Sequence, residues 1–390
     1  MRLLFVADGR SPIALNWIEY FLAQGHEVHL ASTFQSPQEA RLASYTFIPT
    51  AFSSIKPAGK APGKTGGLWG ASAVRLRTTL RQWLGPFTLP GAARQLRLLI
   101  DRLEPDLVHA MRIPYEGMLA ALAGAGAPLV ISVWGNDFTL HAPSTPLMRR
   151  YTHQALQRAT ALHTDCRRDL RLAYRWGYPE SGRAMVLPGA GGVQPEIFYP
   201  PPAIVAEPIV IQPRGVRAYV NYQVFFQAIP LVLERLPAAR FVCTTMQGEP
   251  QAARWVQELG IAAQVELLPK QTRAQMAGLF RQARVAVSPT THDGTPNTLL
   301  EAMACGCLPV VGDLESLREW ITPGVNGLLV NLRYPQALAE AILAALQQDA
   351  LCQRAREENL RLIAERAVHG RVMSAAEQAY RELIGDSRKS

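Results

Sequence analysis

The stretch that decides the fold is Ser288-Pro-Thr-Thr-His-Asp-Gly-Thr-Pro-Asn-Thr-Leu-Leu-Glu301-Ala-Met-Ala-Cys-Gly306. A short β-branched strand ends at Ser288, a polar loop follows, and a helix is predicted with Thr295 as N-cap and Pro296 at its first position. A strand that leads into a helix in this way is typical of parallel α/β proteins. Because a helix N-terminus offers free N–H groups and a positive dipole, the stretch predicts an anion site, and a diphosphate fits it.

Two carboxylates flank this predicted diphosphate site. Glu301 lies five residues into the helix, roughly 7–8 Å along its axis, which is about the distance from a diphosphate to its ribose. Asp293 lies on the loop side, where the sugar of a nucleotide-sugar would be. The alternative is a capped helix with one polar residue on its surface. The residues of this stretch that are predicted to bind such a nucleotide-sugar are Asp293, Gly294, Thr295, Asn297, Thr298, Leu299 and Glu301. Asp293 is also a catalytic candidate.

The length and the strand pattern predict two α/β domains. A chain of 390 residues favours two domains of about 150–200 residues each. The stretch 188–202 has five prolines and is the predicted linker. We therefore expect two Rossmann-like doubly wound domains, 1–187 and 188–370, facing each other across a cleft, with a last helix at about 371–390 packing back on the first. Strands are expected at 3–7, 27–31, 106–110, 129–133 and 161–164, and then at 209–212, 240–244, 265–268, 285–288, 309–312 and 328–330.

The net charge is confined to the first half of the chain. Residues 1–187 contain 21 Lys and Arg against 12 Asp and Glu, whereas residues 188–390 contain 19 of each. With the lysines at 56–64 and the arginine-rich amphipathic segment 72–84, this predicts an anionic membrane surface as partner. The alternatives are a solvated basic face or a site for an acidic soluble acceptor. No aromatic stacking platform supports a nucleic-acid partner.

The cysteines and the apolar runs indicate a reducing, cytoplasmic location. The five cysteines fit no disulfide or zinc pattern, and Cys305-Gly-Cys307 is interpreted as small apolar residues, with a metal or redox pair as the alternative. The uncharged run 117–135 is interrupted by glycines and a proline, so no membrane span is predicted. A peripheral position at the inner face of a membrane is compatible with the charge pattern.

The stretch from Asp293 to Gly306 resembles the donor motif of GT-B glycosyltransferases, specifically the retaining family 4, whose pattern is Glu-x7-Glu. One departure is that the first Glu is Asp293, which is one methylene shorter. The resemblance implies transfer of a sugar from a nucleotide-diphosphate sugar, held by the second half, to a glycan or lipid-linked acceptor, held by the first. Further agreement lies in Gly25-His26-Glu27-Val28, Trp134-Gly135-Asn136-Asp137, Gly192-Val193 with Phe198, and Gly324-Val325-Asn326-Gly327-Leu328.

The resemblance also implies further site residues. Family members bind the donor diphosphate with an Arg and a Lys after the first strand of the second half. Here Arg214 or Arg217 is the arginine, Asn221 stands in the lysine position, and Lys270 is a further candidate or a solvated loop lysine.

In the first half, the resemblance implies that Asp137 orients the acceptor hydroxyl or acts as its base. His109 is predicted to be either catalytic or a buried structural histidine. Ser11, Trp134 and Asn136 are the acceptor-binding candidates.

The sequence lacks the motif of a metal-dependent transferase. It contains no Asp-x-Asp, so arginines and helix N–H groups are expected to stabilise the leaving group, with no metal and no other cofactor. A Gly-x-Gly-x-x-Gly fingerprint is also lacking after the first strand, which argues against a nicotinamide dehydrogenase. Two alternatives remain: a nucleotide-sugar 2-epimerase of the same fold, and a catalytically inactive nucleotide-sugar-binding protein.

Overall fold

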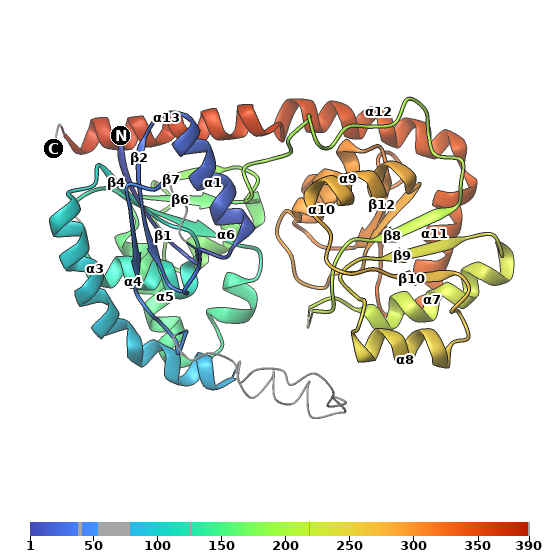
Figure 1. The fold of residues 1–390 in the computed structure, drawn as a ribbon, viewed down its shortest axis with the longest axis horizontal. Helices are drawn as coiled ribbons and strands as arrows, with labels where there is room; N and C mark the ends of the chain where they lie inside the picture. The colour runs from blue at the N-terminus through green and yellow to red at the C-terminus, as the bar shows by residue number, and fades with distance from the viewer. Residues whose placement is uncertain (38–40, 54–78, 125, 218, 389–390) are drawn as a thin grey trace. The chain divides into compact units, whose positions relative to one another are not determined.

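The computed structural model of the chain describes residues 1–37, 41–53, 79–124, 126–217 and 219–388. The chain forms two compact units (Figure 1). Unit 1 comprises residues Met1–Gly191 and Val372–Ser390, and unit 2 comprises Gly192–Arg371. The boundary between the units falls within the proline-rich stretch 188–202.

Unit 1 is built on a parallel sheet with the strand order β3-β2-β1-β4-β5-β6-β7. The order reverses direction between β1 and β4, which is the switch point of a doubly wound sheet. The strands are β1 (Arg2–Ala7), β2 (Glu27–Ser32), β3 (Ser44–Phe47), β4 (Leu107–Ala110), β5 (Leu129–Val133), β6 (Ala161–Thr164) and β7 (Arg183–Val186). The helices are α1 (Pro12–Ala23), η1 (Gly85–Thr88), α3 (Leu89–Leu103), η2 (Ile113–Gly117), α4 (Met118–Ala123), η3 (Asp137–His141), α5 (Pro146–Arg158), α6 (Arg167–Arg175) and α13 (His369–Ser387).

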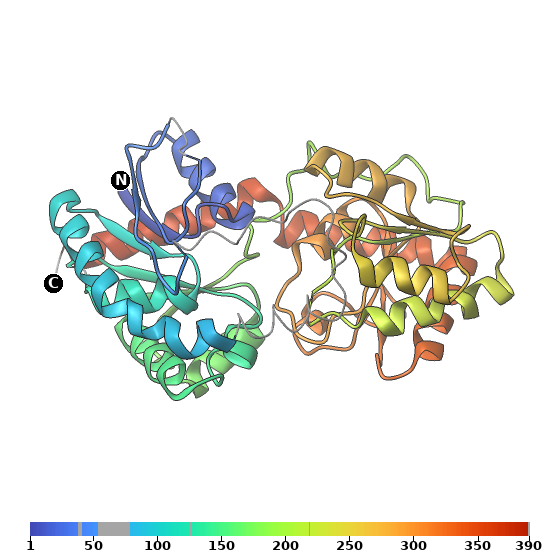
Figure 2. The same ribbon diagram turned by 60° about the horizontal axis from the view of Figure 1, so that its bottom comes forward.

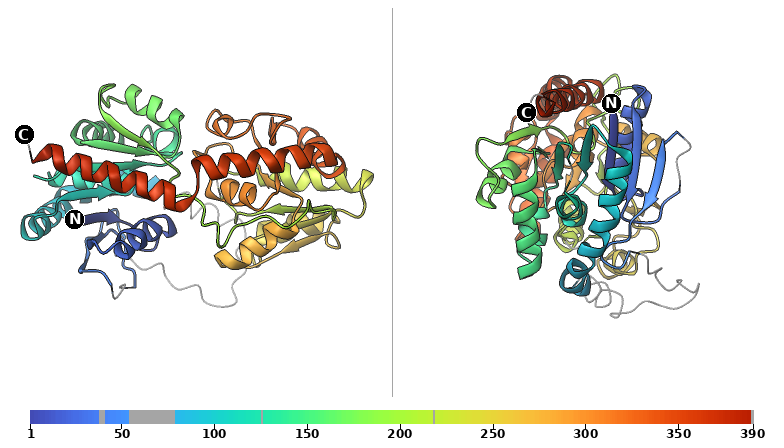
Figure 3. Two further views of the ribbon diagram at one scale, coloured as in Figure 1. Left: turned by 90° about the horizontal axis from the view of Figure 1, so that it is seen from above. Right: turned by 90° about the vertical axis from the view of Figure 1, so that its left-hand side faces the viewer.

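Alternate residues of each central strand enter cores on opposite faces of the sheet. In β1, Leu4 and Val6 pack with α3, α4 and α5, whereas Leu3 and Phe5 pack with α1 and α13. Since side chains alternate along a strand, a continuous apolar run predicts burial on both faces. The C-terminal helix α13 lies along unit 1 (Figure 3) and completes its second core.

Unit 2 repeats the architecture with the strand order β10-β9-β8-β11-β12-β13, again entirely parallel. Val210 of β8 packs with α7 and α11, and its neighbour Ile211 packs with α9 and α10, so helices cover both faces (Figure 2). The strands are β8 (Ile209–Gln212), β9 (Arg240–Cys243), β10 (Val265–Leu267), β11 (Val285–Ser288), β12 (Leu308–Gly312) and β13 (Leu328–Val330). The helices are α7 (Tyr222–Arg235), α8 (Pro250–Glu258), α9 (Arg273–Gln282), α10 (Asn297–Ala304), η4 (Leu317–Glu319), α11 (Pro335–Gln347) and α12 (Asp349–Arg366).

The fold confirms the α/β class and corrects some elements. The strands β3 and β7 were not predicted, because their residues are only partly buried or exposed and give no apolar run. All five cysteines are buried and unpaired, and Cys305 and Cys307 lie in an apolar cluster, as their interpretation as small apolar residues requires. No helix in the described part of the chain is long and apolar enough to span a bilayer.

Candidate active site

The candidate donor site lies at the switch point of unit 2, where β8 and β11 are neighbours. Parallel strands of an open α/β sheet bind ligands outside their carboxyl ends at such a point. Arg214 follows the end of β8, and Asp293 lies in the loop after β11. The topology therefore brings together two residues that are far apart in the sequence.

Arg214 and Asp293 form a largely buried ion pair. The Arg214 Nη1 lies 2.5 Å from Asp293 Oδ2, and its Nε donates to Thr298 Oγ1 at 3.3 Å. Burial lowers the pKa of the Arg214 guanidinium, but the nearby Asp293 carboxylate raises it, and the net pKa is above its ordinary value. A permanent positive charge thus lies beside the first turn of α10.

The first turn of α10 differs in detail from its sequence prediction. The helix begins at Asn297 with Pro296 in the N-cap position, so the prediction of Thr295 as N-cap is wrong. The physical reason is that the buried Thr295 hydroxyl accepts a hydrogen bond from the Trp320 indole at 2.9 Å.

Some N–H groups of this turn are already hydrogen-bonded within the protein, and others are not. The Gly294 N–H donates to Asp293 Oδ1 at 3.1 Å, and the Leu299 N–H donates to the Pro296 carbonyl at 3.0 Å. Gly294 and Leu299 were both predicted as ligands, but their N–H groups are already hydrogen-bonded within the protein. The N–H groups of Asn297 and Thr298 have no acceptor within the described part of the chain. They are the groups that an anion can bind.

Three buried hydroxyls lie beside this site without a hydrogen-bond partner among the described residues. They belong to Thr244 after β9, Ser288 at the end of β11, and Thr290 in the following loop. Buried hydroxyls are almost always hydrogen-bonded, so these three oxygens, which are shielded from solvent, are exceptions at the carboxyl ends of the unit 2 strands. No sequence motif distinguishes them from other strand-end hydroxyls.

Glu301 is the second carboxylate of the predicted donor motif. It is partly buried on α10, and within the described ranges its carboxylate makes no hydrogen bond or ion pair. Burial raises the pKa of Glu301 to about 7, although the charges of Arg273 and Arg214 lower it. A partly desolvated carboxyl group without a partner is suited to accept hydrogen bonds from ligand hydroxyls.

Arg273 is a site residue that the sequence analysis did not identify. It is the first residue of α9, its Nη1 donates to Gln194 Oε1 at 2.9 Å, and its charge acts on Glu301. The sequence around Arg273 does not indicate this role, because Arg273 and Glu301 belong to different helices that meet only in the folded unit.

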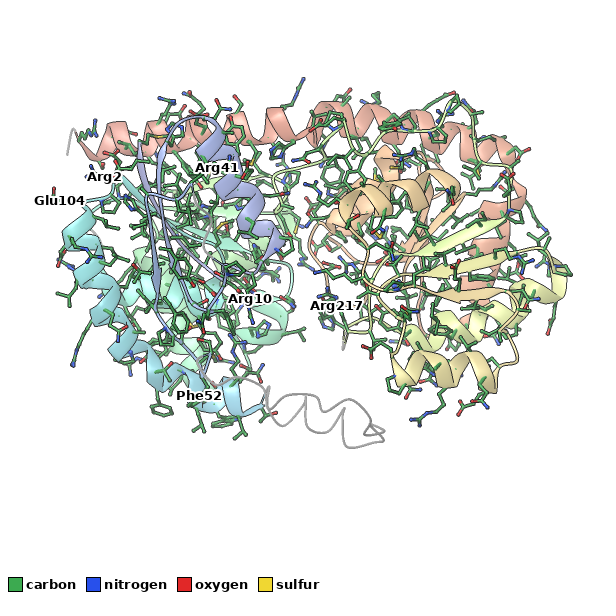
Figure 4. The ribbon with its side chains drawn as sticks, in the orientation of Figure 1. Arg2, Arg10, Arg41, Phe52, Glu104 and Arg217 are labelled. Atoms are coloured by element: carbon green, nitrogen blue, oxygen red, sulfur yellow. The ribbon has the colours of Figure 1, made fainter. Side chains whose placement is uncertain are left out.

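The other predicted phosphate ligands differ from Arg214. Arg217, labelled in Figure 4, is exposed. Its Nη1 contacts the Tyr219 hydroxyl at 3.3 Å. Lys270 is also exposed, and its side chain makes no hydrogen bond or ion pair with the described residues. Asn221 is the N-cap of α7: its Oδ1 accepts from the Val224 N–H at 3.4 Å and its Nδ2 donates to the Leu332 carbonyl at 3.0 Å. The side chain in the lysine position is therefore engaged in capping α7 and in holding the Leu332 carbonyl.

In unit 1, Asp137 is buried and both of its oxygens are occupied. Oδ1 accepts from Arg112 Nε at 2.8 Å, and Oδ2 accepts from the Trp134 N–H at 3.0 Å. Arg112 also donates to Asn136 Oδ1 at 2.7 Å, and its guanidinium lies 5.2 Å from the centre of the Trp134 ring. The predicted role of Asp137 as a base does not fit this geometry, because the carboxylate holds the turn.

His109 lies inside unit 1, fully shielded from solvent. Its Nε2 contacts Ser132 Oγ at 2.8 Å, and its Nδ1 contacts the Tyr380 hydroxyl of α13. Burial lowers the pKa of His109 well below its usual value, and His163 nearby lowers it further. This geometry fits the structural alternative and does not fit a catalytic role.

Two further side chains lie near the carboxyl end of the unit 1 sheet. Ser11 is in the N-cap position of α1 without a capping bond from its side chain. His141, which the sequence analysis did not identify, ends η3. Burial lowers the pKa of His141 to about 4, with Arg112 adding to the effect, so its ring is neutral at physiological pH. His141 is a candidate neighbour of the acceptor.

One group of potential metal ligands occurs among the described residues. The ligand atoms of Asp165, Cys166 and Asp169 lie within 4.8 Å of one another in unit 1. Arg168 donates to Asp169 Oδ1 at 2.5 Å, so a cation already faces this carboxylate. Burial raises the pKa of Asp169 above its usual value, which disfavours the charged form that a metal requires. We assign no metal to this cluster.

Comparison with known proteins agrees with the geometry of both units. The model of the glycosyl transferase 4-like domain matches residues 9–190, and the model of the glycosyl transferases group 1 matches residues 210–348. The chain belongs to the GT-B glycosyltransferases of the family 4 type. The two matches together include the candidate donor site and the Trp134–Asp137 turn.

Individual relatives match parts of the chain. The D-inositol 3-phosphate glycosyltransferase of Mycolicibacterium paratuberculosis is 29% identical over 170 residues, which is 41% of this chain and 38% of that protein. The GDP-mannose:cellobiosyl-diphosphopolyprenol alpha-mannosyltransferase of Xanthomonas campestris is 29% identical over 26% of this chain and 27% of its own length. The chain thus spans well under half of each of these curated relatives.

Solved structures match the fold over nearly the whole chain. Sucrose-phosphate synthase of Thermosynechococcus elongatus aligns with a TM-score of 0.76 over 99% of this chain and 100% of that chain, at 15% identity. Anabaena HepE in complex with UDP-glucose aligns with a TM-score of 0.72 over 98% of this chain and 100% of that chain, at 14% identity. At these identities the likeness concerns the fold alone.

Proposed function

We propose that this chain transfers a sugar from a nucleotide-diphosphate sugar to a hydroxyl group of an acceptor, with retention of the anomeric configuration. The observation that supports this most is the convergence of Arg214, the open N–H groups of α10 and the unpartnered Glu301 at the switch point of unit 2. Each group suits one part of the donor: a cation and N–H groups for the diphosphate, and a carboxylate for the ribose.

The leaving diphosphate would be stabilised by protein groups without a divalent metal. Arg214 carries its charge at any working pH, and it lies beside the N–H groups of Asn297 and Thr298. Cations and N–H dipoles that are in place before the reaction stabilise developing charge without reorganisation. Asp293 supports this arrangement because it holds Arg214, and it is also a candidate to contact the donor sugar.

The donor and acceptor classes are inferred with support from the relatives. Because HepE was crystallised with UDP-glucose, uridine nucleotides are the first donors to test. The acceptor that we propose is a glycan or a lipid-linked glycan bound by unit 1, as the polyprenol-linked substrate in the name of the Xanthomonas relative suggests. A lipid-linked acceptor would place the chain at the inner face of a membrane.

A product assay tests this proposal. The purified chain is incubated with UDP-, GDP- and ADP-sugars and a set of soluble and lipid-linked glycans, and products are resolved by mass spectrometry and NMR. We expect a new α- or β-glycoside with the anomeric configuration of the donor. Inversion contradicts the proposed stereochemistry. Nucleotide binding without product favours an inactive binding protein, and an epimerised donor without acceptor favours the 2-epimerase.

A further inference from the structure

Four neighbouring strands of unit 1 end beside the switch point of that unit. In the order β2-β1-β4-β5, they end at Ser32, Ala7, Ala110 and Val133. Open α/β sheets bind their ligands outside the carboxyl ends of the strands at such a point. The side chains that gather after these strands therefore indicate the chemistry of a ligand of unit 1.

Three arginines gather at this point of unit 1. Arg10 follows β1, Arg112 follows β4, and Arg81 precedes η1 in the sequence. The guanidinium carbons of Arg10 (labelled in Figure 4) and Arg81 lie 3.7 and 5.1 Å from the centre of the same Phe34 ring. The charges of Arg81 and Arg112 both act on His141, since each lowers the pKa of its ring. The three arginines therefore form one group, which we call the arginine cluster.

Two arginines of the cluster are paired with carboxylates. Arg10 Nε lies 3.0 Å from Asp8 Oδ1, and Arg10 Nη2 lies 2.9 Å from Asp8 Oδ2. Arg112 Nε lies 2.8 Å from Asp137 Oδ1. Arg81 differs from both, because no carboxylate lies within ion-pair distance of its guanidinium in the part of the chain that the structure describes. Arg81 therefore gives the cluster an excess of positive charge.

Glu116 lies near the cluster but forms no ion pair with Arg81 in the described ranges. Its carboxyl group is buried and accepts a hydrogen bond from Thr33 Oγ1 at 2.6 Å. Burial raises the pKa of Glu116 above its ordinary value, although the charges of Arg112 and Arg81 lower it. Because burial disfavours the ionised form of this carboxyl group, Glu116 is poorly suited to balance the charge of Arg81.

Aromatic side chains hold Arg81 in place. Its guanidinium carbon lies 5.0 Å from the centre of the Tyr115 ring and 5.1 Å from that of Phe34, and its backbone carbonyl accepts from the Tyr115 hydroxyl at 2.7 Å. The side chain is partly buried, and its Nε is shielded from solvent without a hydrogen-bond partner. A guanidinium that contacts rings can still donate two parallel N–H bonds from its end, and phosphate oxygens match that geometry.

We propose that Arg81 binds a phosphate group of the acceptor and that Arg10 and Arg112 add positive potential to this subsite. The acceptor is then a phosphorylated sugar or polyol, or a glycan linked to a lipid diphosphate, since both present the same chemistry. His141 is neutral at physiological pH, so it can exchange hydrogen bonds with acceptor hydroxyls without adding charge. The role of the subsite in sugar transfer rests on the proposed function, whereas its binding of phosphate does not.

Titration of inorganic phosphate into the full chain tests the subsite directly. All proteins contain Arg214→Ala, which weakens the candidate donor site, and binding is followed by tryptophan fluorescence at constant ionic strength. We expect Arg81→Gln to bind phosphate at least about tenfold more weakly than this parent, because a charge-assisted bidentate contact is lost. Arg81→Lys keeps the charge without the forked geometry and should lie between the two. The matched control is Arg94→Gln, which changes an exposed arginine of α3 and should bind as the parent does.

Two results of the titration overturn the subsite. Equal phosphate affinity in the parent and all its variants shows an adventitious ion only, and a parent that binds no phosphate also contradicts the proposal. If Arg81→Gln does not fold, Arg81→Lys decides in its place, since affinity equal to that of the parent would exclude the bidentate contact.

Transfer assays identify the source of the phosphate. Soluble sugar and polyol phosphates are compared with their dephosphorylated forms, and polyprenol-diphosphate glycans with the free glycans. We expect the phosphorylated member of one class to have a kcat/KM at least about tenfold higher, and Arg81→Gln to reduce this preference to within about threefold at unchanged donor KM. Equal use of both members, or a preference that survives in Arg81→Gln, overturns the proposal. Phosphate binding that depends on Arg81 in a chain that transfers no sugar contradicts the proposed function and not the subsite.

Discussion

At the scale of single residues, Glu301 gives the donor site a pH dependence. Its pKa of about 7 in the free protein is raised by burial from 4.5. Ribose hydroxyls donate to the ionised carboxylate, so nucleotide affinity should be nearly constant above about pH 8 and fall by about tenfold between pH 8 and pH 6. Because the folded pKa is above the unfolded one, ionisation of Glu301 also lowers the free energy of unfolding as the pH rises from about 4.5 toward 7.

The matched variant for this prediction is Glu301→Gln, which keeps the shape and removes the titration. Calorimetric titration of UDP from pH 6 to 8 should give a flat affinity for the variant, apart from ionisation of the nucleotide itself. A wild-type profile that parallels that of Glu301→Gln would exclude Glu301 as the titrating group.

Arg214 should carry most of the diphosphate binding. Arg214→Ala removes a largely buried cation and leaves Asp293 unpaired, so we expect a loss of about 3 kcal/mol or more in kcat/KM. The exposed Arg217 is the control, and Arg217→Ala should cost less than about 1 kcal/mol. Steady-state kinetics of the two variants decide. Wild-type kcat/KM in both arginine variants, together with a large loss of kcat/KM in Lys270→Ala, would show that the diphosphate is bound elsewhere.

The sequence predicted the site residues that belong to local motifs. Glu301 and the turn before it could be identified because a capped helix after a strand is a local pattern. The partners of these residues could not, since Arg214–Asp293, Arg273–Glu301 and Arg112–Asp137 join segments far apart in the chain. His109 was left open between two roles because burial of a strand-end histidine depends on what covers it, here Tyr380 of α13.

At the scale of elements, residue 221 caps the helix α7, whereas a phosphate contact was expected of it. Asn221→Lys loses the side-chain bond to the Val224 N–H, so the free energy of unfolding should fall by about 1 kcal/mol. The donor KM should change by less than about threefold, because Arg214 already supplies the charge. Asn221→Asp keeps the cap but loses the Nδ2 donor to the Leu332 carbonyl, so its loss of stability in urea unfolding measures that second bond. A large gain in donor affinity for Asn221→Lys would contradict this account.

The strands that could be predicted are marked by short apolar runs, and most of them are buried on both faces of a sheet, although β13 is a partly buried edge strand. The strands β5, β6, β8, β11 and β13 have the predicted bounds because their apolar runs end at turn residues or charges. The edge strands β3 and β7 of unit 1 lack such runs, because their residues are partly buried or exposed. Helix α12 was also missed, since its apolar face is interrupted by many charged residues.

At the scale of the whole molecule, transfer should proceed without a divalent metal. The sequence has no Asp-x-Asp, and Arg214 with the α10 N–H groups can meet the charge of the leaving diphosphate. Initial rates with the donor found by product analysis should be unchanged in excess EDTA, within about twofold. Activity that is abolished by EDTA and restored by Mg²⁺ or Mn²⁺ contradicts this mechanism.

The central claim is that the switch point of unit 2 binds a nucleotide-diphosphate sugar through Arg214 and Glu301. Isothermal titration of UDP, GDP and ADP into the wild type, Glu301→Ala and Arg214→Ala, all in EDTA, tests it most directly. We predict binding of one nucleotide per chain, weakened by about 2–4 kcal/mol in Glu301→Ala, because a partly buried charged acceptor of hydrogen bonds is lost. Wild-type affinity in both folded variants, or no binding of any nucleotide to the wild type, would contradict the claim.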